Sequence, residues 1–176
     1  STFTDSNWDS AQTITVTGVD EDIIDGSINT TITLAVVDGS SDNNFDPLAN
    51  QTVTAATADN DSAGFTVTQS GGSTTVNESG TTDTFTVVLT AEPASDVVIS
   101  VTSGDTGEAT VSAASLTFTA GNWDSAQTIT VTGVDDDIID GSINTTITLA
   151  VVDGSSDNNY DPLANQTVTA ATADND

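Results

Sequence analysis

The alternating run Thr128-Ile129-Thr130-Val131-Thr132 leads directly into the acidic stretch Gly133-Val134-Asp135-Asp136-Asp137-Ile138-Ile139-Asp140-Gly141-Ser142. Alternation of polar and apolar residues with a period of two is typical of a β-strand that buries one face. The acidic stretch therefore predicts a loop that begins where this strand ends. The same strand and loop pattern recurs, almost letter for letter, at residues 13–27.

This recurrence is part of a long internal repeat. Residues 3–61 and 118–176 differ at only four of 59 positions, namely Asp5/Ala120, Ser6/Gly121, Glu21/Asp136 and Phe45/Tyr160. Such similarity between neighbouring segments is typical of a tandem array. We therefore interpret residues 62–176 as one complete repeat and residues 1–61 as the C-terminal half of a preceding repeat.

The chain then contains one front half, residues 62–117, and two back halves. However the halves pair, one back half in each chain lacks a front half, and we expect residues 1–61 to expose one face of an incomplete fold. We interpret the chain as an excerpt of a longer, periodic polypeptide.

Alternating residues bounded by Gly, Pro and Asp predict roughly seven to nine short strands in the complete repeat, and no stretch has a helical period. The predicted strands cover residues 64–68, 73–77, 84–90, 97–102, 109–111, 116–118, 128–132, 145–152 and 166–171. Many short strands without helices predict an all-β protein, an antiparallel β-sandwich of immunoglobulin-like type. Trp8 and Trp123 lie in identical turns before a strand, and we expect them to be packing anchors, with a sugar-stacking platform as the alternative.

The composition excludes several functions. The chain has 27 acidic residues, a net charge of −27, and no Lys, Arg, His, Cys or Met. Nucleic acid and bare anionic membranes would be repelled, and no apolar run is long enough to insert directly into a membrane. Without His, Cys or Lys, neither a nucleophilic triad nor a zinc site of the usual kind is possible, so we expect a protein that is not an enzyme. Only a carboxylate pair for glycoside hydrolysis remains as a catalytic alternative.

The acidic loop is the first candidate metal site. Four carboxylates lie within six residues, at Asp135, Asp136, Asp137 and Asp140, and Glu78 joins them if the loops at one end of the sandwich converge. Like charges at this density repel, and oxygen ligands on a loop are those that Ca²⁺ prefers. The copy of this loop holds Asp20, Glu21, Asp22 and Asp25. A solvated acidic turn without an ion is the alternative.

Two further acidic segments are candidate sites. Asp174 and Asp176 match Asp59 and Asp61, which lie at the junction of two repeats, where calcium would stiffen a linker that is otherwise a polar hinge. A third segment places Asp157, Asn159 and Asp161 at the one-three-five spacing of a calcium loop, with its copy at Asp42, Asn44 and Asp46. Because this loop has Pro162 and Val168 at two EF-hand positions, it is not an EF-hand, and a plain polar loop is an equal alternative.

With these motifs placed, the complete repeat resembles the Calx-β domain family, and in particular the Calx-β-like tandem repeats of giant bacterial surface proteins and RTX-type adhesins. The segments that carry the resemblance are Val76-Asn77-Glu78-Ser79-Gly80, Phe85–Leu89, Leu116–Trp123, Thr130–Asp137 and Asp174–Asp176. The resemblance implies a calcium site at one tip of the sandwich, and cadherin-like repeats are the alternative assignment. Its implied ligands are Glu78, Asp105, Asp135, Asp136, Asp140, Asp174 and Asp176.

These observations predict a non-catalytic structural repeat of a long extracellular protein at a bacterial cell surface, an adhesin stalk or a filament made rigid by Ca²⁺. The expected partners are neighbouring repeats, with lateral or end-to-end self-assembly and O-linked glycans as further possibilities. A carbohydrate- or ice-binding module is the alternative function, and it would need an aromatic cluster or a regular, exposed array of Thr.

Overall fold

The computed structural model describes all 176 residues, which form two compact units. The first, here called the half unit, comprises residues 1–21 and 26–59. The second, here called the complete unit, comprises residues 60–176 together with the short segment 22–25. No helix in the chain is both long enough and apolar enough to cross a lipid bilayer.

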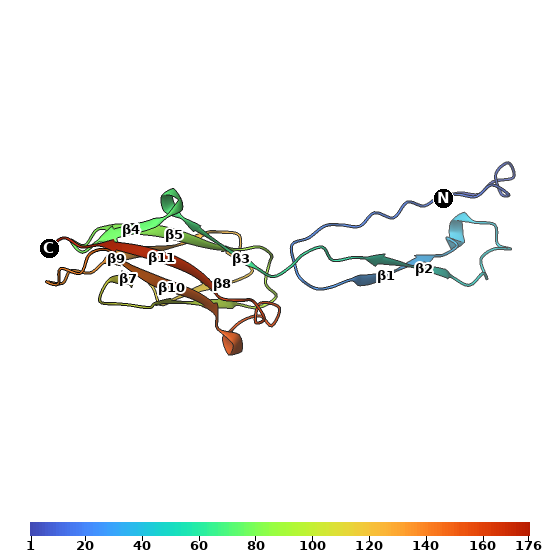
Figure 1. Ribbon diagram of the computed structural model, residues 1–176. Coiled ribbons are helices and arrows are strands. Elements are labelled where there is room, and N and C mark those ends of the chain that lie inside the picture. Colours follow the sequence, from blue (N-terminus) through green and yellow to red (C-terminus); the bar gives the residue numbers. More distant parts are fainter. The chain divides into compact units, whose positions relative to one another are not determined.

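The complete unit is a β-sandwich of two sheets, with the strand order β4-β11-β10-β6-β8 in one and β3-β5-β9-β7 in the other (Figure 1). All neighbouring strands are antiparallel except β4 and β11, which are parallel. The strands are β3 (Phe65–Gln69), β4 (Thr74–Asn77), β5 (Thr82–Leu89), β6 (Val97–Ser103), β7 (Ala109–Val111), β8 (Ser115–Phe118), β9 (Gln127–Gly133), β10 (Ile143–Val151) and β11 (Gln166–Ala173). Two single turns of 3-10 helix, η2 (Ser70–Gly72) and η3 (Asp153–Ser155), lie in loops. The predicted immunoglobulin-like β-sandwich is confirmed, and each predicted segment overlaps one strand.

The core follows from the alternation in the sequence. In β5, Phe85, Val87 and Leu89 point inward and are buried, and Ile129 and Val131 of β9 do the same beside them. The facing sheet contributes the corresponding inward positions of its own strands, Val97, Ile99, Val101, Ile147, Leu149, Val168 and Ala170. The Thr residues between them face outward. Trp123 packs against the edge of this core, as expected for an anchor.

Tyr160 is a fully buried part of this core. Its hydroxyl donates a hydrogen bond of 2.6 Å to the carbonyl oxygen of Ala91, and burial raises its pKa to about 12. The other copy of the repeat has Phe45 at this position.

We therefore expect Tyr160→Phe to destabilise the complete unit by about 1–3 kcal/mol, because the buried carbonyl of Ala91 loses its partner. Urea unfolding at fixed calcium measures this change. Phe45→Tyr is the matched control, since Phe45 is exposed in the half unit and the substitution should leave the transition unchanged. Equal stability of Tyr160→Phe and the parent chain would contradict the hydrogen bond.

The half unit is an antiparallel hairpin of β1 (Ile28–Leu34) and β2 (Gln51–Thr57), with η1 (Asp38–Ser40) between the strands. Its register repeats that of β10 and β11, so that Ile28 is opposite Thr57 as Ile143 is opposite Thr172. The two strands form a sheet by themselves. The half unit therefore retains the hairpin of a back half, whereas residues 12–18, the counterpart of β9, form no strand.

The segment 22–25 is part of the complete unit. Ile23 forms a parallel bridge with Glu92, whose amide donates a hydrogen bond of 2.7 Å to the carbonyl oxygen of Asp22. Asn159 donates its side-chain amide to the carbonyl oxygen of Ile24 at 3.3 Å, and Ile24 packs against the core. This part of the first acidic loop is thus anchored through its backbone and its apolar side chains.

Candidate metal centre

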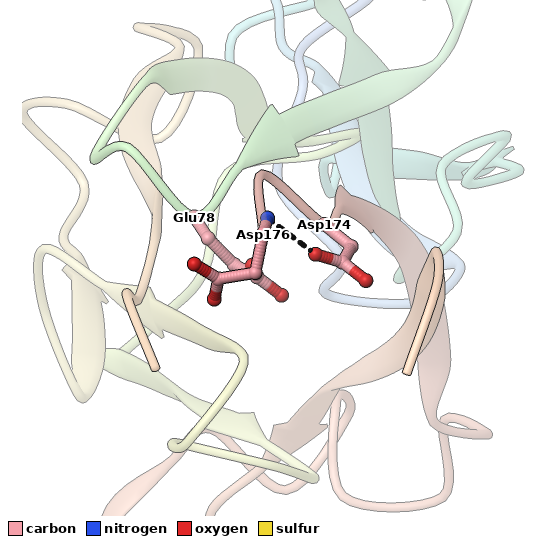
Figure 2. Close-up of side chains that lie close together, drawn as sticks. All are labelled: Glu78, Asp174 and Asp176. Atoms are coloured by element: carbon pink, nitrogen blue, oxygen red, sulfur yellow. Dashed lines mark hydrogen bonds between the residues drawn. The ribbon is translucent and has the colours of Figure 1, made fainter. Parts of the chain in front are cut away.

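The parallel pair of β4 and β11 brings three acidic residues together. Asn77 is opposite Ala173 at the end of both strands, and the amide of Glu78 donates a hydrogen bond of 3.1 Å to the carbonyl oxygen of Ala173. The residues that follow, Glu78 from one strand and Asp174 and Asp176 from the other, leave the sheet at the same point. Figure 2 shows the three side chains close together, with the hydrogen bond from the amide of Asp176 to the carboxylate of Asp174 as a dashed line.

These three side chains form the first acidic group. One carboxylate oxygen from each of Glu78, Asp174 and Asp176 lies within 4.8 Å of the others, and Glu78 is 1% exposed. Asp174 accepts amide hydrogen bonds of 2.8 Å from Asp176 and from Gly141, and Glu78 accepts one of 3.1 Å from Asn175. Backbone amides thus fix the carboxylates of Glu78 and Asp174, while no cationic side chain exists in the chain to neutralise the group.

A second acidic group lies at the same end of the sandwich. Ala109 of β7 is opposite Gly133 of β9, and the amide of Val134 donates a hydrogen bond of 2.9 Å to the carbonyl oxygen of Glu108. Glu108 thereby meets the acidic loop, and its carboxylate lies with those of Asp136 and Asp140, again within 4.8 Å. Glu108 is 8% exposed, and its buried Oε2 has no hydrogen-bond partner.

The two groups influence each other electrostatically. Burial raises the pKa of Glu78, and the charges of Asp174, Asp136 and Asp140 raise it further, against a lowering by the amide of Asn175. Burial, and then the charges of Asp140, Asp136, Glu78 and Asp105, raise the pKa of Glu108. Burial and neighbouring carboxylates likewise raise the pKa of Asp176, whereas the amides of Asp176 and Gly141 lower that of Asp174. The end of the sandwich that holds both acidic groups, here called the tip, therefore carries more negative charge than its surroundings stabilise.

This imbalance predicts an unusual pH dependence for the calcium-free protein. Because the pKa values of Glu78, Glu108 and Asp176 are raised in the folded state, the folded protein binds protons that the unfolded chain does not. Its stability should therefore rise as the pH falls from neutrality toward the ordinary glutamate value of 4.5. Asp174 acts in the opposite direction, and only below its ordinary value of 3.8.

Chemical unfolding of chelator-treated protein at several pH values measures this trend. With saturating calcium the trend should reverse, since protons compete with the metal for the same carboxylates. A calcium-free stability that falls steadily from pH 7 to pH 5 would contradict the geometry of the tip.

The remaining residues predicted for the complete unit lie around these two groups in different roles. Asp135 accepts a hydrogen bond of 3.3 Å from the side-chain amide of Asn175, and the charge of Asp137 acts on Asp176. Asp105 accepts the amide of Gly107 at 2.9 Å and so shapes the turn before β7. Its charge reaches Glu108, which is the carboxylate that this loop contributes to the group.

Glu108 was not among the residues predicted from the sequence. It lies in Thr106-Gly107-Glu108-Ala109, outside any run of acids, so that clustering along the chain does not identify it. A weak signal exists, because it is one of only three glutamates in residues 62–176 and it directly precedes a strand.

In the half unit, the acidic residues are not gathered into such a group. Asp59 accepts the amide of Gly26 at 2.8 Å, as its counterpart Asp174 does from Gly141. The segment that holds Asp22 and Asp25 belongs to the complete unit, near Glu92, and neither residue is in the two groups. Asp20, Glu21 and Asp61 are also outside both groups.

The third predicted segment lies at the opposite end of the sandwich, beside the loop between β5 and β6. Asp157 accepts backbone amides from Ala94 at 2.7 Å, Ser95 at 3.1 Å and Asn159 at 2.9 Å, so its carboxylate fastens two loops together. Burial and the neighbouring Asp153 raise the pKa of Asp161. In the half unit, Asp42 accepts the backbone and side-chain amides of Asn44, and Asp46 follows in the same loop. The carboxylates of Asp157 and Asp42 therefore already have hydrogen-bond partners within the protein.

The donor set of the tip is made of oxygen atoms alone. Six carboxylates from four segments of the chain form its two groups. Such hard, anionic ligands suit Ca²⁺, which accepts six to eight oxygens in flexible geometry. They do not suit zinc or copper, which favour the His and Cys side chains that the chain lacks.

No protein-family profile matches the chain, and no curated protein matches it either. Among solved structures, the apo form of the Calx CBD1 domain is similar, with 15% identity, a TM-score of 0.42, and coverage of 64% of this chain and 98% of that chain. Domains 1–6 of the surface layer protein SbsC are 22% identical at a TM-score of 0.41, over 71% of this chain and 15% of that chain. SSP-19 of Caenorhabditis elegans, which is like the MSP-domain proteins, is 14% identical at a TM-score of 0.40, over 62% of this chain and 99% of that chain. The β-sandwich fold is established by the strand order and pairing of the complete unit itself.

Proposed function

We propose that this chain is a non-catalytic structural repeat of a long extracellular bacterial protein, and that Ca²⁺ bound at the tip makes it rigid. The observation that carries the proposal is Glu108, whose buried carboxylate oxygen has no partner in the protein and lies beside Asp136 and Asp140. A buried, unpaired carboxylate is costly, and a bound cation supplies the missing partner.

Calcium acts here as a clamp between strand ends. Glu78 follows β4, Glu108 precedes β7, Asp136 and Asp140 follow β9, and Asp174 and Asp176 follow β11. An ion bound in either group removes the repulsion within it. The first group ties β4 to β11 in one sheet, and the second ties β7 to β9 in the other. Since only the folded arrangement gathers these ligands, calcium stabilises the folded protein by mass action.

The proposed setting follows from the same chemistry. Extracellular modules bind calcium with dissociation constants of about 10⁻⁴–10⁻³ M, so the millimolar calcium outside cells occupies half or more of such sites. A tandem array in which each tip is clamped by an ion is suited to an adhesin stalk or a surface filament. The absence of His, Cys and Lys supports a role without catalysis.

A chain extended after Asp176 by a second copy of residues 62–176 tests this proposal by small-angle scattering. We expect calcium to increase the maximum dimension of the particle and to narrow the distribution of its conformations. Magnesium should have a smaller effect. The matched variant Glu108→Gln, introduced in both copies, should behave with calcium as the parent does with chelator. A scattering profile that is unchanged by calcium would contradict the structural role.

A hydroxyl-rich face supports a second candidate function, a carbohydrate- or ice-binding module. On the five-stranded sheet, Thr146 is directly opposite Thr169, and Thr148 is opposite Thr167, on the side away from the core. Thr102 and Thr75 of the flanking strands are also exposed. A glycan array and an ice-recrystallisation assay with the intact chain test this alternative, and Thr146→Val with Thr169→Val should abolish any positive result.

A further inference from the structure

The end of the complete unit opposite the tip carries two loops that are fastened to each other. Asp157 accepts the amide of Ala94 at 2.7 Å, and the buried hydroxyl of Tyr160 donates to the carbonyl oxygen of Ala91 at 2.6 Å. These contacts hold the loop after β5 against the loop after β10, and the two form one surface. This surface, here called the basal surface, comprises residues 90–96 and 156–163.

The basal surface already binds a short segment, residues 22–24. The amide of Glu92 donates a hydrogen bond of 2.7 Å to the carbonyl oxygen of Asp22, and Ile23 forms a parallel bridge with Glu92. The side-chain amide of Asn159 donates to the carbonyl oxygen of Ile24 at 3.3 Å, and the side chain of Ile24 packs against the core. The segment is thus held by its main chain and by one apolar anchor, a recurring mode of peptide recognition.

The bound segment recurs in the complete unit. Asp22-Ile23-Ile24-Asp25 is repeated letter for letter as Asp137-Ile138-Ile139-Asp140 in the second acidic loop. Because the contacts use main-chain carbonyls and an isoleucine side chain, the second segment offers the basal surface the same groups as the first. Ile138 and Ile139 are 60% and 81% exposed, so they need not leave a core in order to bind.

We propose that the basal surface is a docking site between successive repeats, and that its occupant is the Asp-Ile-Ile segment of the acidic loop of the repeat before it. Asp137, Ile138 and Ile139 of the complete unit then bind the basal surface of a following repeat in the same polypeptide.

The acidic loop therefore has two functions. The carboxylates of Asp136 and Asp140 belong to the second acidic group, and the two isoleucines lie between them in the chain. An ion held by both carboxylates fixes both ends of the docking segment, so calcium at one tip favours docking of the next repeat. This link rests on the proposed calcium site, whereas the docking itself does not.

Hydrogen exchange of the intact chain, followed by mass spectrometry of peptides that contain the Glu92 amide, tests the occupied site. We expect Ile24→Ser to speed exchange of this amide at least about tenfold, because the segment loses its apolar anchor. Ile139→Ser is the matched control and should leave the exchange unchanged. Slow exchange of the β5 peptides shows in each variant that the sandwich is intact. Equal exchange of the Glu92 amide in Ile24→Ser and the parent would overturn the proposal.

A chain extended after Asp176 by a second copy of residues 62–176 tests the second segment. The parent should protect the Glu92 amide in both copies, and Ile24→Ser or Ile139→Ser alone should release about half of this protection. The double variant should release all of it. Full protection in the extended Ile139→Ser chain would overturn the proposal. Equal protection in calcium and in chelator would contradict only the link to calcium, and failure to bind calcium with both amides protected would contradict only the proposed metal function.

Discussion

Glu78→Gln is expected to remove most of the stabilisation that calcium gives to the complete unit, and to raise the stability of the calcium-free protein. Glutamine keeps the size of the buried side chain and still accepts a hydrogen bond from the amide of Asn175. It removes one negative charge from a group in which Asp174 and Asp176 lie within 4.8 Å. The same substitution therefore has opposite effects in the two conditions.

The free energy by which calcium stabilises the folded state follows from mass action. A ligand at about 100 times its dissociation constant stabilises the folded state by about 2.7 kcal/mol, and for a domain of this size that corresponds to a midpoint shift of roughly 10 °C. Thermal unfolding of parent and variant, with calcium and with chelator, measures both effects. Asp124→Asn is the matched control, because Asp124 is exposed and outside both acidic groups. A variant that is destabilised equally in both conditions would show that Glu78 has only a packing role.

Gly133→Ala is expected to destabilise the complete unit strongly, whereas Gly18→Ala in the half unit should be neutral. A Cβ at position 133 would clash with the carbonyl oxygen of Asn77 and would lie 2.7 Å from its carbonyl carbon. Both are backbone atoms, so β4 and β9 would have to separate at the tip. At position 18 the nearest atom is a side-chain methyl of Thr57 at 3.5 Å, an ordinary contact.

Overpacking of this kind costs about 1–3 kcal/mol or more, and here it also displaces Glu78, which follows Asn77 directly. We therefore expect Gly133→Ala to lose calcium affinity as well as stability. Urea unfolding and calcium titration of the two glycine variants test this pair of effects. Equal behaviour of the two variants would mean that β4 and β9 do not approach each other as described.

The strands could be predicted because their information is local. Alternation such as Phe85, Val87 and Leu89 predicts a half-buried strand, and Gly and Pro mark where it ends. The same alternation at residues 13–17 forms no strand, because the half unit offers it no partner strand. The convergence of Glu78 with Asp174, in contrast, depends on β4 pairing in parallel with β11, which lies about ninety residues further along the chain. Periodicity carries no information on strand partners, so only the resemblance to a known family suggested this convergence.

Glu108 shows more clearly which part of the site could not be predicted from the sequence. The loop that contains it was expected to contribute Asp105, which instead accepts an amide hydrogen bond in its own turn. Which of two nearby acids faces the tip depends on the register of β7 against β9, where Ala109 is opposite Gly133. The exposed face of residues 1–61, by contrast, was predictable, because the chain contains two back halves and one front half.

The central claim is that calcium holds the tip of the complete unit together, and thermal unfolding of the intact chain tests it most directly. Circular dichroism is recorded with about 10 mM Ca²⁺, roughly 100 times a dissociation constant of about 10⁻⁴ M, with equal Mg²⁺ and with chelator, all at the same ionic strength. We expect the midpoint of the main transition to rise by roughly 10 °C in calcium and by much less in magnesium, which tolerates fewer and more rigidly placed oxygen ligands. An equal midpoint in all three conditions would contradict the account, because the acidic groups would then be solvated without a bound ion.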